Sequence, residues 1–137
     1  MRAIKILVPM FVLMLAIMPA QAKEEAPMTV EGATTISTGD AKALFDKGAI
    51  FVDVRGGADF EAGRIPGAVH LDLKSTLTEA ALMEAADKGQ DIVMYCNSQK
   101  CGLSSAASVK AVAWGFTAVK YFRDGFPGWQ TAGYPVE

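Results

Sequence analysis

The sequence predicts a single α/β domain, built on a doubly wound sheet of about five mostly parallel strands with helices on both faces. Short β-branched runs alternate with helical patterns along the chain, and parallel strands need such helical crossovers between them. The chain has 137 residues, the length of one domain, and 51% of them are hydrophobic, which is too many for a disordered polymer. Because the formal net charge is only -2, we expect no nucleic-acid ligand.

Residues 1–22 have the features of a secretory signal peptide. Arg2 and Lys5 give a basic start, an apolar stretch follows from Ile6 to Met18, and Ala20-Gln21-Ala22 is typical of a cleavage site. The apolar stretch is shorter than the roughly 20 residues that span a bilayer. We therefore expect a bacterial protein that is periplasmic or secreted, with no membrane attachment after cleavage; an uncleaved anchor is the less favoured alternative.

Residues 23–33 are polar, contain a proline and lack periodicity, so we expect a flexible N-terminal segment. The domain is expected to occupy residues 34–137. Four runs in it are rich in β-branched and aromatic residues and predict buried strands over 49–54, 68–71, 91–95 and 117–122.

Three segments outside these strands predict helices. A capping-box-like start at Ser37 opens a helix to about Lys47, and Thr76-Leu77-Thr78-Glu79 opens another to about Lys88. The third helix is expected over about 103–114, and the residues expected on its inward face are Val109, Val112 and Ala113.

The segment after the third of these runs has the features of a reactive loop. Cys96 follows a buried strand and a helix begins near Leu103, so the thiol is expected at the carboxyl end of a parallel strand, where active sites gather. A tight loop that enters a helix points unpaired amides inward, and these stabilise a thiolate or a bound anion. The chemistry expected is nucleophilic attack by Cys96 through a covalent sulfur intermediate. The residues expected to form the anion cradle are Asn97, Ser98, Gln99, Lys100 and Gly102, with Lys100 adding a cation.

The two cysteines leave a second interpretation open. Cys96 and Cys101 are five positions apart, and in an oxidising compartment they can simply pair. His70 is the one imidazole in the chain, and a lone histidine at a strand end is more often structural than a general base. One histidine and two cysteines at this spacing do not match a zinc site, so we expect neither a metal nor a cofactor.

Residues 52–70 have the sequence Val52-Asp53-Val54-Arg55-Gly56-Gly57-Ala58-Asp59-Phe60-Glu61-Ala62-Gly63-Arg64-Ile65-Pro66-Gly67-Ala68-Val69-His70. This segment resembles the signature of single-domain rhodaneses, the thiosulfate sulfurtransferase family, which is D-V-R-x-x-x-[DE]-[FY]-x-x-G-[HR]-I-x-G-A-x-[HN]. Residues 115–119 and 123–129 resemble the closing elements of that family. The resemblance covers about residues 34–135 and implies a five-stranded sheet whose weak first strand is Thr34-Thr35-Ile36.

Several polar residues of the signature also have a physical interpretation. Asp53 and Arg55 end a strand and are expected to brace neighbouring loops, with Arg64 in a supporting role. Asp59 and Arg64 are expected to form a solvated ion pair. Phe126 and Trp129 are expected to seal the core rather than touch a substrate.

The loop departs from the common rhodanese form, C-R-x-G-x-R-S. It is longer, lacks both arginines and carries Cys101, and so resembles a subgroup with C-x-x-x-x-C-x-x-S. The related phosphatases and arsenate reductases need an arginine six residues after the cysteine, where this chain has Gly102. Without that planar fork to hold phosphate, phosphatase activity is not expected.

The resemblance implies a sulfurtransferase. Cys96 would take a sulfane sulfur from thiosulfate, polysulfide or a persulfide and pass it to a thiol, to cyanide or to a protein acceptor, and Cys101 would be a resolving thiol or a disulfide partner. The alternatives are a non-catalytic binding module with a permanent Cys96–Cys101 disulfide, or a thiol redox protein, although the spacing is not C-x-x-C.

Overall fold

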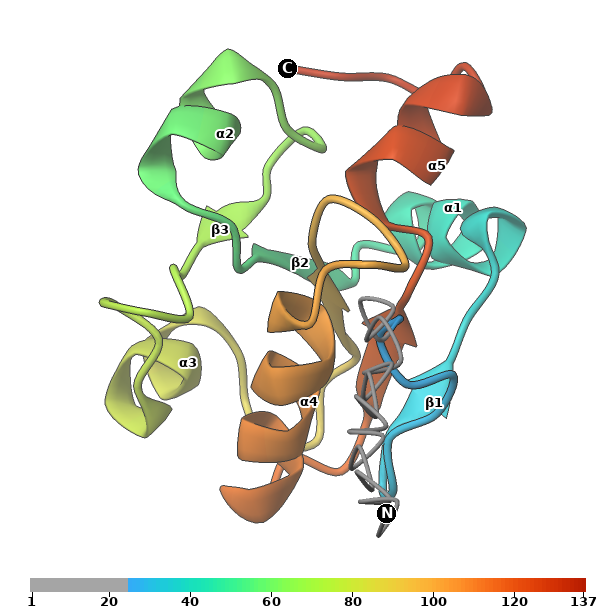
Figure 1. Ribbon diagram of the computed structural model, residues 1–137. Coiled ribbons are helices and arrows are strands. Elements are labelled where there is room, and N and C mark those ends of the chain that lie inside the picture. Colours follow the sequence, from blue (N-terminus) through green and yellow to red (C-terminus); the bar gives the residue numbers. More distant parts are fainter. Residues whose placement is uncertain (1–24) are drawn as a thin grey trace, which may run out of the picture.

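Residues 25–137 are described by the computed structural model, and five strands alternate with five helices along them (Figure 1). The signal peptide predicted at 1–22 lies outside the described residues. The strands are β1 Thr34–Thr35, β2 Ile50–Asp53, β3 Val69–His70, β4 Ile92–Tyr95 and β5 Val119–Phe122. The helices are α1 Thr38–Asp46, α2 Gly57–Ala62, α3 Glu79–Ala85, α4 Leu103–Ala113 and α5 Gly125–Thr131.

All five strands form one parallel sheet, in the order β1-β5-β4-β2-β3. The central strand β4 pairs with β2 through Asp53↔Tyr95 and with β5 through Tyr95↔Phe122, so three strand ends meet at one level. The edge strands β1 and β3 have two residues each. The predicted α/β class with a five-stranded sheet is thereby confirmed.

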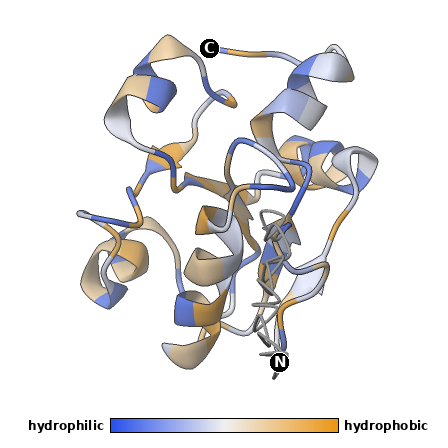
Figure 2. Cartoon of the chain, in the orientation of Figure 1, coloured by the Kyte–Doolittle hydropathy of each residue, from blue (hydrophilic) through white to orange (hydrophobic). Residues whose placement is uncertain are grey.

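Side chains that alternate along the strands build a core on each face of the sheet. On one face the strands pack against α3 and α4, through residues that include Met94, Leu82 and Ala107. On the other face they pack against α1 and α5, through Tyr95, Ala41 and Trp129 among others. Figure 2 shows hydrophobic colour along much of the central sheet, whereas the loop above α4 is largely hydrophilic.

The predicted start of α1 has the hydrogen bonds of a capping box. The Asp40 amide donates to Ser37 Oγ at 3.1 Å, and the Ser37 amide donates to Asp40 Oδ2 at 3.3 Å. Helix α3 is shorter than predicted, because it is capped by Thr78 and ends at Ala85, and Ala86 is extended. The Lys88 carbonyl, expected inside that helix, instead accepts the Thr117 amide at 2.9 Å.

The inward face of α4 differs from the prediction. Val109 is 55% exposed and Ala113 is also exposed, while Val112 is only partly buried. The buried residues of the helix are Ser104, Ser105, Ala107, Ser108 and Ala111. Small residues let the helix lie close to the sheet, and two of the serines satisfy their hydroxyls on the helix itself, since Ser108 Oγ donates to the Ser104 carbonyl at 2.7 Å and Ser105 Oγ to the Gly102 carbonyl at 3.0 Å.

Residues 25–33, within the segment expected to be flexible, lie against the sheet and the loop. Ala26 and Val30 are buried. The Ala26 amide donates to the Gln99 carbonyl at 2.8 Å, and Tyr121 Oη donates to the Pro27 carbonyl at 2.8 Å. Groups distant in sequence thus supply partners for this segment that its local composition does not reveal. No helix within residues 25–137 is long and apolar enough to cross a membrane.

Candidate active site

Strand β4 carries Cys96 to the carboxyl edge of the sheet. Cys96 follows Tyr95 directly, is 1% exposed, and packs on the α4 face among residues such as Met94 and Ala107. Its carbonyl oxygen accepts the Phe126 amide at 2.8 Å, which ties the root of the loop to the start of α5. The expected placement of the cysteine between a buried strand and a helix is therefore what the structure has.

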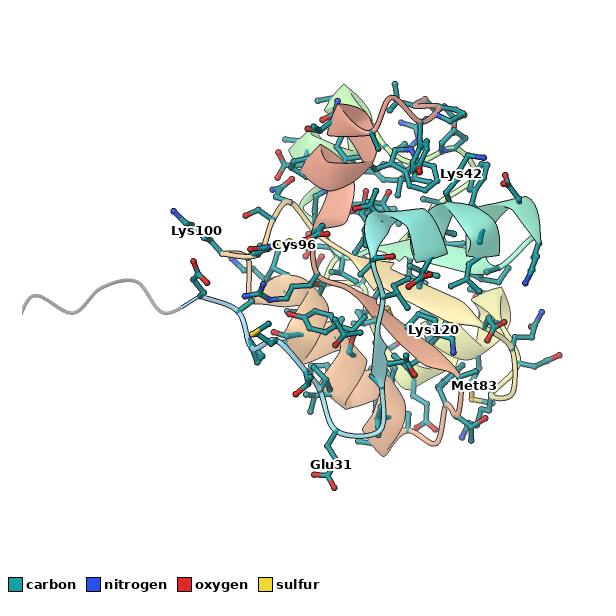
Figure 3. The ribbon with its side chains drawn as sticks, turned by 90° about the vertical axis from the view of Figure 1, so that its right-hand side faces the viewer. Glu31, Lys42, Met83, Cys96, Lys100 and Lys120 are labelled. Atoms are coloured by element: carbon teal, nitrogen blue, oxygen red, sulfur yellow. A yellow bond between two sulfur atoms is a disulfide. The ribbon has the colours of Figure 1, made fainter. Side chains whose placement is uncertain are left out.

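Cys96 and Cys101 are joined by a disulfide, with their Cα atoms 6.5 Å apart. The loop closes within itself through the Cys101 amide, which donates to the Ser98 carbonyl at 3.0 Å. Lys100 and Gly102 are exposed, and Cys101 is partly exposed. In Figure 3 the Lys100 side chain points away from the protein, whereas Cys96 lies inside the fold. The two cysteines thus form one closed ring in which one end is buried and the other borders solvent.

Amides gather where this loop enters α4. The first intrahelical bond runs from the Ala106 amide to the Gly102 carbonyl at 3.1 Å. The amides of Leu103, Ser104 and Ser105 therefore have no acceptor within the helix, and the N-terminal end of the helix has a partial positive charge. This arrangement favours a thiolate or another anion near the loop.

A buried ion pair lies beneath the loop. Asp53 is fully buried and Arg55 is 2% exposed, and Arg55 Nη2 donates to Asp53 Oδ2 at 2.7 Å while its Nε donates to Oδ1 at 3.0 Å. Burial lowers the pKa of Arg55, but the hydrogen bond and charge of Asp53 raise it by more, so the net pKa is raised. Burial, aided by Asp53, raises the pKa of Tyr95 above its ordinary value. The site thus keeps a charged guanidinium and a neutral phenol.

Arg55 also connects this pair to the loop. Its Nη1 donates to Asn97 Oδ1 at 3.2 Å, and Asn97 Nδ2 donates in turn to Asp59 Oδ2 at 3.2 Å. A further bond from Arg55 Nη2 to the Gly63 carbonyl, at 2.6 Å, reaches the segment after α2. The bracing role expected of Asp53 and Arg55 thus has a specific form: their pair holds the side chain of the residue next to Cys96.

The outer side of the loop is held from the end of β5, which the sequence did not indicate. Gln99 Nε2 donates to Asp124 Oδ1 at 2.7 Å, and Thr38 Oγ1 donates to Asp124 Oδ2 at 3.3 Å. A cavity of about 590 Å³ lies beside these residues and is also lined by Lys100, Glu25 and part of α5. Its lining includes neither cysteine, so the cavity adjoins the loop without opening onto the sulfur atoms.

Two residues of the signature have structural contacts. Arg64 Nε lies 3.7 Å from Glu137 Oε2, and its guanidinium lies over the Phe60 ring; the ion pair expected between Arg64 and Asp59 is wrong, because Asp59 binds Asn97. His70 stacks on Phe60, and its Nε2 lies 2.7 Å from the Arg55 carbonyl, an oxygen that can only accept. His70 is therefore a structural donor in this geometry, and it supports the backbone of Arg55.

Comparisons with known proteins agree with the geometry. Residues 37–132 match the family model described as "Rhodanese-like domain". A protein named thiosulfate sulfurtransferase GlpE, from Pseudomonas syringae pv. syringae, is 38% identical over 97 residues, which cover 71% of this chain and 86% of that protein.

Solved structures share the fold. The BH2092 protein from Bacillus halodurans superposes with a TM-score of 0.68 at 25% identity, covering 77% of each chain. The rhodanese-like domain of the Alr3790 protein from Anabaena sp. superposes with a TM-score of 0.65 at 22% identity, covering 75% of this chain and 77% of that one. Its likeness concerns the fold alone.

Proposed function

Since the chain belongs to the rhodanese-like domain family, we propose that it is a sulfurtransferase that carries a sulfane sulfur on Cys96. The observation that carries the proposal is the place of Cys96, at the carboxyl end of the central strand and before the amides that begin α4. The proposed site of action is the periplasm or the cell exterior, after removal of residues 1–22.

The proposed reaction begins from the reduced loop. The Cys96 thiolate attacks the outer sulfur of thiosulfate, the sulfur–sulfur bond of the donor breaks, and sulfite leaves with the electron pair. The persulfide anion on Cys96 then lies beside the amides at the start of α4 and those of the loop, which stabilise its charge. An acceptor such as cyanide or a thiol attacks the terminal sulfur, and Cys96 leaves as a thiolate. Polysulfides and other persulfides enter the same scheme as donors.

The other residues of the loop have supporting roles in this proposal. Asn97, held by Arg55, fixes the first turn after Cys96. Ser98, Gln99, Lys100 and Gly102 supply a short polar path whose amides form the cradle, and Lys100 brings the one cationic side chain of the loop toward an anionic donor. Arg64 acts at a distance, through its contact with the segment around Phe60.

A second candidate function follows from the disulfide. If the Cys96–Cys101 bond is permanent, the domain is a non-catalytic binding module, and the ring of residues 96–101 is a structural staple. The absence of arginine from the loop sequence favours this candidate, because the common rhodanese loop has two. The burial of Cys96 at a strand end is compatible with both candidates.

Intact mass spectrometry separates the two. The protein is reduced, the reductant is removed, and thiosulfate is added. A sulfurtransferase gains about 32 Da, and the gain disappears when cyanide is added and thiocyanate forms. A binding module gains no sulfur and returns, on oxidation, to a mass about 2 Da below that of the dithiol form. The Cys101→Ser variant is the matched control, since it retains Cys96 and cannot close the ring.

A further inference from the structure

The two cysteines of the Cys96–Cys101 bond differ in their exposure to solvent. Cys96 is 1% exposed and is surrounded by the core between the sheet and α4. Cys101 packs against the edge of that core but is partly exposed, and both of its neighbours in the chain, Lys100 and Gly102, are exposed. The bond thus joins a buried residue to one that borders solvent.

This difference decides where a thiol can attack. A thiolate attacks one sulfur of a disulfide from the side opposite the sulfur that leaves, so the three sulfur atoms lie nearly in line. The rate therefore depends on access to the attacked sulfur. Cys96 belongs to the same buried cluster as Met94 and Ala107, so attack on Cys96 would require the incoming sulfur to enter a close-packed core. Attack on Cys101 comes from the solvent side of the loop.

We propose that the oxidised loop is opened by a dithiol reductant that attacks Cys101 and releases Cys96 as the thiolate. This inference rests on the proposed function, because it supplies the free Cys96 that sulfur transfer needs. The attacking thiolate forms a bond to Cys101 Sγ, the Cys96–Cys101 bond breaks, and Cys96 takes the electron pair. The second thiol of the reductant then loses its proton and displaces Cys101, so that the reductant ends as a disulfide and both loop cysteines are reduced.

The closeness of the two cysteines is the reason for a dithiol. After the first step, Cys96 stays five residues from Cys101 and tied at its carbonyl to Phe126, so its effective concentration at the mixed disulfide is high. It attacks Cys101 again and expels a monothiol, which restores the ring. A dithiol competes with this return because its own second thiol is equally close to the mixed disulfide.

The positional test uses the oxidised wild-type protein. The protein is mixed with excess glutathione under native conditions, quenched at short times with acid that contains 4,4′-dithiodipyridine, which labels thiols at a pH too low for ring closure, and mapped by peptide mass. The expected early product has glutathione on Cys101 and the pyridylthio label on Cys96. Glutathione on Cys96 at the earliest times, or equally on both, would overturn the inference.

The dithiol test compares dithiothreitol with glutathione at the same total thiol concentration and pH. Ring opening is expected to reach completion with dithiothreitol and to stop at a minor fraction with glutathione. A parallel reaction with a thioredoxin tests whether the dithiol can be a protein. Opening by thioredoxin and by dithiothreitol supports a protein reductant, and opening by dithiothreitol alone supports a small dithiol. Failure of both to open the native ring contradicts the proposal.

The outcome is separable from that of the proposed function. If glutathione attaches to Cys101 but the reduced protein takes no sulfur from thiosulfate, the inference stands and sulfur transfer fails. If the reduced protein forms the persulfide but glutathione attaches first to Cys96, sulfur transfer stands and the inference fails. The Cys101→Ser variant is the reference for persulfide formation, because it can form a persulfide without ring opening.

Discussion

The carbonyl oxygen of Cys96 and the amide of Phe126 are joined by a 2.8 Å hydrogen bond. The bond is possible because Gly125 has φ +64° and lies directly against the Cys96 carbonyl, where a Cβ atom on residue 125 would collide with the oxygen. The start of α5 and the root of the loop are therefore positioned by each other.

Gly125→Ala should destabilise the domain and shift the loop. The left-handed backbone alone costs an alanine about 1–2 kcal/mol, and the collision with a backbone oxygen adds about 1–3 kcal/mol. Urea unfolding measures the sum. Gly67→Ala is the matched control, because Gly67 has φ +73° but open space around it. Equal losses in the two variants would contradict the close contact.

Arg55→Met should cost about 3–5 kcal/mol of unfolding free energy, because it leaves the fully buried Asp53 carboxylate without its cation. The same variant should broaden or shift the NMR amide signals of residues 97–102, since Arg55 no longer holds Asn97. Arg64→Met is the control: its ion pair with Glu137 is partly exposed, and its loss should cost less than about 1 kcal/mol. If Arg55→Met left both the free energy of unfolding and these amide signals unchanged, the bracing role would be refuted.

Cys96→Ser should abolish sulfur transfer to cyanide while the circular dichroism spectrum stays that of the wild type, because a serine hydroxyl is not a sulfur nucleophile. Cys101→Ser should retain transfer and let the persulfide accumulate, since no resolving thiol remains in the loop. Thiocyanate formation and intact mass report both results. Substantial activity in Cys96→Ser would move the nucleophile to Cys101.

The disulfide should contribute modestly to stability. Closing so short a ring is worth about 2 kcal/mol, so oxidised wild type should melt several degrees above Cys101→Ser. Reduced wild type is the internal control and should melt near the variant. If reduction leaves the melting temperature unchanged, the disulfide does not stabilise the fold, and the prediction is wrong.

Lys100→Ala should weaken binding of anionic donors more than of neutral ones. Lys100 is exposed, so its charge is screened and the expected rise in KM for thiosulfate is about two- to fivefold at low salt, shrinking as salt is added. Lys110→Ala, on the exposed side of α4, controls for a general change in surface charge. An unchanged KM would assign anion binding to the backbone amides alone.

Much of the fold was predictable because its signals are local. The strands around Phe51 and Val93 are continuous apolar runs, and the Ser37 cap lies next to the helix it begins. Helices α2 and α5 were not predicted: they are short, contain glycine, and neither has a side-chain cap. The inward face of α4 was predicted wrongly because the valines were preferred over the serines, although a helix close to a sheet favours small residues.

The position of Cys96 was likewise predictable from the strand, loop and helix that surround it. The contacts that hold the loop were not predictable, because their partners lie far apart in the chain. The Gln99 side chain donates to Asp124, and the Gln99 carbonyl accepts the amide of Ala26. A solvated ion pair was expected between Asp59 and Arg64, yet the buried Arg55 positions Asn97 between itself and Asp59. Local patterns therefore located the nucleophile, while its neighbours depended on the tertiary arrangement.

The two-residue length of β1 and β3 has a consequence for solubility. Sheet edges present unpaired backbone donors and acceptors to other chains, and long flat edges promote aggregation. Each outer strand here offers only Thr34–Thr35 or Val69–His70 to an approaching strand, too few residues for a stable intermolecular ladder. The four-residue strands β2, β4 and β5 lie inside the sheet, where β4 is paired along both edges and the outer edges of β2 and β5 are paired with the two-residue strands. The short outer strands therefore limit edge-to-edge pairing between copies of the described domain.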